Sequence, residues 1–208
     1  NRTFCFWTGA TTVIGTIQSN SYYNNVIRSL VLIIEKLRAK LVFKKLNLII
    51  SLGEIDVRTK LFLEGKKNNI TIENVILDYC NEKLARKLTL FREVINGLFE
   101  QLQVSIYFKS PPPPSSALKV TTPKTGMELN ELLKKDLFPA FLPLEERRQH
   151  HDILVNSIKK ACLMSGIKFL NSSYSGNNIL KPEMSFDGVH VSKGEWAIKN
   201  SKQIFIEL

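Results

Sequence analysis

Residues 48–58 read Leu-Ile-Ile-Ser-Leu-Gly-Glu-Ile-Asp-Val-Arg, an apolar run that passes directly into a polar loop. The apolar run, 46–51, predicts a strand. In a parallel α/β sheet, ligands bind beyond the carboxyl ends of the strands, where such loops lie. The loop after this strand is therefore the first place to look for a site, and it carries Gly53, Asp56 and Arg58.

Strand and helix patterns alternate along the chain. Strands are predicted at 3–7, 46–51, 104–108 and 167–170. Helices are predicted at 22–41, 73–102 and 144–165, and the segments 8–21 and 52–61 are predicted to be loops. This alternation predicts one α/β domain with a parallel sheet, helices on both faces and right-handed crossovers.

The segment between the third strand and the last helix has a different composition. Residues 111–114 are four consecutive prolines, which exclude a helix or a central strand. We favour a rigid loop there, and a site for a proline-binding module is the alternative. Residues 115–143 resemble an insertion with a small helix near 127–136.

A second stretch with residue types suited to catalysis lies near the C-terminus, where residues 185–192 read Ser-Phe-Asp-Gly-Val-His-Val-Ser. Asp187 and His190 stand three residues apart in a loop that precedes a helical pattern. A histidine there can act as a general base, and the carboxylate can fix its tautomer and stabilise its charged form. On spacing alone, a turn Asp beside a surface His is the commoner explanation.

Three stretches resemble, in the same order, sequence blocks of the SGNH/GDSL hydrolase superfamily. Residues 7–11 resemble the second block, residues 53–58 resemble the third block in a G-E-I-D-x-R variant, and 187–190 match the fifth block, D-x-x-H. The resemblance spans nearly the whole chain. It implies a three-layer α/β/α flavodoxin-like fold and the cleavage of esters, with His190 as general base and Asp187 as its orienter.

The resemblance also assigns roles in the second and third blocks. Gly9 would offer a backbone N–H to an oxyanion, and Gly53 and Asp56 would form the third block, with Asp56 shaping the loop. Ile55 stands where the family has an oxyanion Asn, and losing one such donor costs about 3 kcal/mol of transition-state stabilisation. Arg58 is either a substitute donor or the ion-pair partner of a neighbouring carboxylate.

The family's nucleophile is missing from the sequence. The chain contains no Gly-Asp-Ser block and no Gly-Asp dipeptide, and Ser19 and Ser51 are poor substitutes. Because the second-block match begins by Thr8, the first block and the central first strand are expected upstream of Asn1. The single domain, 1–208, is therefore expected to lack both.

The charge and composition bear on whether nucleic acid or a membrane is an expected partner. The net charge is +10, but the basic residues are scattered in pairs, which favours solvated surface over a working basic face. A nucleic-acid partner is not expected, and no phosphate-binding glycine motif is present. No apolar run reaches the roughly 18 residues that a membrane span needs.

The cysteines and histidines carry less information. Cys5, Cys80 and Cys162 are an odd, widely spaced set, which predicts buried thiols in a reducing compartment such as the cytoplasm. His150 and His151 are adjacent on a predicted helix and have no ligand partner at i+4, so no metal site is expected. No cofactor is expected either.

The function expected from the sequence is an SGNH-type esterase or acyltransferase that acts on a small-molecule or carbohydrate ester. The alternative is a catalytically silent SGNH-like module that binds a sugar or a protein partner. A weaker alternative is an α/β domain that binds nucleic acid through its basic surface. The sequence does not indicate an oligomeric state.

Overall fold

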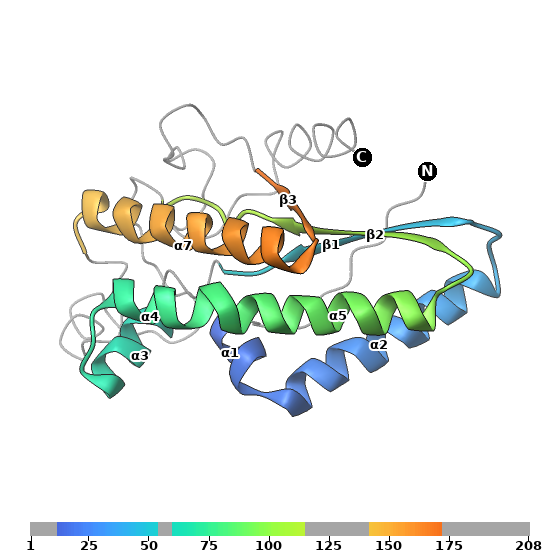
Figure 1. Cartoon of the computed structure of the whole chain (residues 1–208), viewed down its shortest axis with the longest axis horizontal. Coiled ribbons are helices and arrows are strands. Elements are labelled where there is room, and N and C mark those ends of the chain that lie inside the picture. Colours follow the sequence, from blue (N-terminus) through green and yellow to red (C-terminus); the bar gives the residue numbers. More distant parts are fainter. Residues whose placement is uncertain (1–11, 54–59, 115–141, 172–208) are drawn as a thin grey trace, which may run out of the picture.

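The computed structural model describes residues 12–53, 60–114 and 142–171 (Figure 1). Its sheet contains, within those ranges, the strands β1 (Lys45–Ser51), β2 (Gln103–Lys109) and β3 (Lys168–Leu170). The strands are parallel and lie in the order β1-β2-β3. The predicted α/β class and parallel sheet are confirmed, and the strand predicted at 3–7 lies outside the described residues.

Two helices precede β1, namely α1 (Val13–Gln18) and α2 (Asn20–Arg38). The connections between the described strands contain α3 (Leu61–Asn68), α4 (Ile72–Asp78), the π-helical η2 (Tyr79–Lys83), α5 (Leu84–Leu98) and α7 (Leu144–Ser165). Figure 1 shows α5 and α7 side by side, and both serve as crossovers between neighbouring parallel strands. Right-handed crossovers that advance in one direction put their helices on the same face of the sheet. A helical layer on the second face, as in a flavodoxin-like fold, remains a prediction.

The sheet register separates an inner from an outer face. Ile50 pairs with Phe108, which pairs with Phe169, and these side chains belong to the hydrophobic core or pack against it. The alternate residues of β1, such as Asn47 and Ile49, are exposed. The alternation of period two in β1 therefore decides which strand residues meet the helices.

The α7 helix follows the sequence prediction. It spans Leu144–Ser165, and Gly166 ends it in the left-handed conformation with φ of 68°. Its buried residues recur at spacings of three and four, as in an amphipathic helix. They are Arg147, His151, Leu154, Ser157, Ile158, Ala161, Cys162 and Ser165.

Two segments are helical although the sequence predicts a loop at 8–21 and a polar turn at 65–69. Residues 13–18 form α1, which begins at Thr12, whose hydroxyl accepts a hydrogen bond from the Gly15 N–H at 2.8 Å. Residues 61–68 form α3, which ends at Asn69 in the left-handed conformation with φ of 53°. Thr and Asn, read as loop residues in the sequence, act here as helix caps.

The predicted helix 73–102 is interrupted and shorter. Its first half contains the π-helical turn Tyr79–Lys83, and its α5 part ends at Leu98. Cys80 in the π-turn and Cys162 on α7 are both buried, as predicted, while Cys5 lies outside the described residues. Of the helices described, none combines the length and the apolarity that crossing a bilayer would take.

Candidate functional site

Gly53 lies just beyond the carboxyl end of β1, in a conformation that favours glycine. Its φ is 103°, and it is buried. A Cβ atom at this position would lie 3.3 Å from Cβ of Pro111 and 3.7 Å from Cδ1 of Ile158. The end of β1 therefore contacts both the proline segment that follows β2 and the α7 helix. We call this region, with Gly53, Pro111 and Ile158, the carboxyl rim.

Hydrogen bonds hold the chain after β2 in place on this rim. The Ser110 N–H donates to the carbonyl oxygen of Leu170 at 2.9 Å, which extends the pairing of β2 with β3. The Ser110 hydroxyl donates to the carbonyl oxygen of Pro111 at 3.2 Å. Pro111 and Pro113 are buried, in agreement with the rigid-loop interpretation of the proline run.

His151 of α7 contacts the same carbonyl. Its Nε2 lies 3.2 Å from the Pro111 oxygen, and because a carbonyl only accepts, Nε2 carries the proton. In the neutral ring Nδ1 then holds a lone pair. The Nδ1 atom is buried and has no hydrogen-bond partner in the described part of the chain. It lies 3.5 Å from Oδ1 of Asp152. Burial lowers the pKa of His151, partly opposed by the Pro111 carbonyl and Asp152.

This arrangement makes His151 a structural residue rather than a base. A general base needs a lone pair within reach of the proton that it removes. The Nε2–H of His151 already donates to the Pro111 carbonyl, and Nδ1 is buried, so neither nitrogen is accessible to a substrate. The ring therefore serves to fasten the segment after β2 to α7, which fixes the shape of the carboxyl rim.

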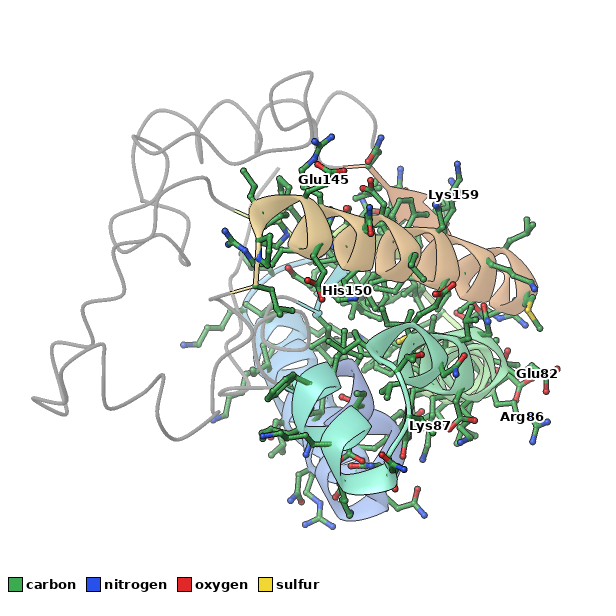
Figure 2. All side chains as sticks on the ribbon, turned by 90° about the vertical axis from the view of Figure 1, so that its left-hand side faces the viewer. Glu82, Arg86, Lys87, Glu145, His150 and Lys159 are labelled. Carbon is green, nitrogen blue, oxygen red and sulfur yellow. The ribbon has the colours of Figure 1, made fainter. Side chains whose placement is uncertain are left out.

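His150 lies on a different side of α7. Figure 2 shows it on the side directed towards α4. Burial lowers its pKa, opposed by the carboxylates of Glu146 and Glu73. Within the ranges that the structure describes, no group of three or more His, Cys, Asp or Glu side chains is placed to hold a metal ion.

Of the residues predicted for the site, Gly53 is the one that the structure describes. Its place at the carboxyl rim agrees with the expectation that the third-block loop follows a strand at the ligand-binding edge. The other five lie outside the described residues, and their approach to Gly53 stays a prediction. They are Gly9, Asp56, Arg58, Asp187 and His190.

The sequence reasoning missed the role of His151. A signal was present, because His151, Leu154 and Ile158 follow the spacing of three and four residues that marks the buried face of α7. That spacing predicts a buried histidine that needs a polar partner. The partner itself is the Pro111 carbonyl, 40 residues away, and no local sequence pattern predicts that contact.

A scan against protein-family models and a search of curated proteins found no match to this chain.

Replacing Gly53 with alanine is expected to destabilise the fold by about 1–3 kcal/mol, because the new Cβ meets Pro111 and the φ of 103° strains an L-residue. Urea denaturation measures the change. Gly97→Ala is the matched control, since its Cβ would have no neighbour within 4 Å, and in α5 it is expected to stabilise by about 0.5–1 kcal/mol. Equal effects at both positions would contradict the packing of Gly53 against the proline segment.

Stability is expected to fall in mild acid. A histidine whose pKa is lowered by folding binds fewer protons in the folded than in the unfolded chain, so the free energy of unfolding decreases as the pH drops below the unfolded pKa, about 6.5. Urea denaturation at about pH 7.5 and about pH 5.5 measures this loss. In His151→Gln the amide N–H can still reach the Pro111 carbonyl, and the loss should be smaller. The same loss in both proteins would contradict the assignment to His151.

Proposed function

We propose that this chain is an SGNH-type hydrolase, an esterase or acyltransferase that acts on a small-molecule or carbohydrate ester. The observation that carries the proposal is the position of Gly53 at the carboxyl rim of a parallel sheet. The residue that opens the third-block match follows β1 directly and contacts the segment after β2. In α/β sheets of this kind, ligands bind beyond the carboxyl ends of the strands.

The proposed chemistry is acyl transfer by a serine, assisted by His190. His190 takes the hydroxyl proton as the serine attacks the ester carbonyl, and returns it to the departing alcohol. Asp187 holds the imidazole in the required tautomer. Water, or an acceptor hydroxyl in an acyltransferase, then attacks the acyl-enzyme by the same route. The sequence contains no Gly-Asp-Ser block, and the proposal names none of its serines as the nucleophile.

The oxyanion is proposed to be stabilised by the N–H of Gly9 together with Arg58. Ile55 has no side-chain donor to offer at the position where the family has Asn. The guanidinium of Arg58, three residues later, can donate two hydrogen bonds and carries a positive charge. Asp56 is proposed to shape the loop between Gly53 and Arg58.

The test treats the full-length protein with a fluorophosphonate probe and with a panel of acetylated sugars and aryl esters. Covalent labelling of a serine, together with turnover of at least one ester, is the expected result. A correctly folded protein that neither reacts with the probe nor cleaves any ester of the panel would contradict the hydrolase proposal.

We also propose a reducing compartment such as the cytoplasm. Support comes from Cys80 and Cys162, which are buried as thiols in the core.

A silent SGNH-like module that binds a sugar or a protein is the second candidate, and the substitution of Ile55 for the oxyanion Asn favours it. Calorimetric titration with the same sugars separates the two candidates. Binding of equal affinity in the parent protein and in His190→Ala, without turnover in either, would support the module.

A further inference from the structure

A charged and apolar surface is formed by α5 and the end of α7. A shallow groove there is lined by Glu82 of η2, by Arg86, Thr89, Leu90 and Glu93 of α5, and by Met164 of α7. Among these lining residues, Met164 is 53% exposed and Leu90 is 45% exposed. We call these residues the α5–α7 face. Large apolar side chains grouped at such exposure mark a surface that a partner covers.

The charges on this face are arranged symmetrically about its middle. Arg86 and Glu93 are seven residues apart, two turns of helix, so they lie on the same side of α5. The midpoint between them falls between Thr89 and Leu90. An antiparallel copy of α5 turned about a two-fold axis at that midpoint puts each Arg86 at the same height as Glu93 of the other copy. The face is thus complementary in charge to itself.

The position opposite Glu82 is compatible with this antiparallel pairing of α5 helices. The same axis puts Glu82 opposite Gly97, where an added Cβ would meet no atom within 4 Å, so neither a like charge nor a side chain opposes Glu82. Arg86 already lies 3.3 Å from Glu82 in its own chain, and both side chains are largely exposed. In a two-fold assembly the guanidinium would lie between Glu82 of its own chain and Glu93 of the second copy.

We propose that two copies of this chain form a symmetric dimer through the α5–α7 face, with antiparallel α5 helices. Leu90 and Met164 would form its apolar centre, and the Arg86–Glu93 pairs would fix its register. An isologous contact of this kind closes on itself, as most homodimers do. The dimer does not depend on the proposed hydrolase activity.

A charge-swap experiment tests the dimer and its register. Analytical ultracentrifugation is expected to show a concentration-dependent dimer for the parent chain. Arg86→Glu alone and Glu93→Arg alone should each raise the dimer Kd by about tenfold or more, because each puts two pairs of like charges together. A mixture of the two variants should form a heterodimer with a Kd within about threefold of the parent's, since both of its pairs are again opposite in charge.

Lys159→Glu is the matched control for the charge change. Lys159 is exposed on α7, and Figure 2 shows it on a different side of the helix from His150 and away from Glu82 and Arg86. The dimer Kd of Lys159→Glu should equal that of the parent chain. A chain that stays monomeric at several hundred micromolar would overturn the proposal. So would a dimer that neither single variant weakens, or a mixture that fails to recover the affinity.

Discussion

Replacing His190 with alanine is expected to lower kcat/KM for ester cleavage by about four orders of magnitude. In the proposed mechanism no other group would remove the proton of the attacking serine, and loss of a triad member in serine hydrolases has an effect of this size. The measurement is the initial rate of the full-length protein with the best ester of the panel, and circular dichroism checks the folding.

His150→Ala is the control for this variant. His150 is half-buried on α7 beside Glu73 and Glu146, and the proposed reaction does not use it. Its kcat/KM should stay within about threefold of the parent's. Asp187→Asn should retain the fold and lose activity in the same direction as His190→Ala. Unchanged turnover in His190→Ala would remove the histidine from the mechanism and with it the SGNH assignment.

Replacing Phe108 with alanine is expected to lower the free energy of unfolding by about 3–5 kcal/mol. Phe108 is fully buried in β2, between Ile50 of β1 and Phe169 of β3 in the sheet register. The truncation would leave a cavity where the sheet meets its helices, and single domains have only about 5–15 kcal/mol of stability in total. Urea denaturation followed by circular dichroism gives the value.

Val42→Ala is the comparison for Phe108→Ala. Val42 lies between α2 and β1 with its side chain fully exposed, so its truncation should change stability by no more than about 0.5 kcal/mol. A loss below about 1 kcal/mol in Phe108→Ala would mean that β2 is not the central strand of the hydrophobic core.

Where local signals agree, the elements could be predicted from sequence. The helix Leu144–Ser165 follows Pro143 and ends at Gly166, so both ends carry a residue whose backbone preference marks a boundary. The strands β1 and β2 were each predicted to within one residue at either end. The helix Leu61–Asn68 was missed, because its Gly-Lys-Lys-Asn half has the composition of a turn and the helix depends on the burial of Leu61 and Glu64.

The spacing of apolar residues in the sequence partly explains the π-helical turn Tyr79–Lys83. The buried residues Ile76, Cys80, Leu84 and Leu88 are each four apart. In a regular α-helix, steps of four drift round the axis by about 40° each, so three steps would carry Leu88 away from the face of Ile76. The wider turn at Tyr79–Lys83 absorbs this drift and keeps all four on the core side. A run of fours is therefore a sign of a π-turn.

The candidate site was predictable only where it follows a strand. Gly53 was expected at the carboxyl rim because the loop after a parallel strand must begin there, and that expectation is confirmed. The contact between His151 and the Pro111 carbonyl joins residues that are distant in sequence. It depends on how the proline segment meets α7, which neither composition nor periodicity determines.

We propose that the imidazole of His190 lies at the same carboxyl rim as Gly53. Spin labels test it directly, in a background without native cysteines, as Ser51→Cys with Ser192→Cys and as Lys45→Cys with Ser192→Cys. Ser51 and Lys45 are exposed at opposite ends of β1, about 20 Å apart. We expect the label at Ser192 to lie much closer to Ser51 than to Lys45. A label closer to Lys45, at the amino ends of the strands, would contradict it.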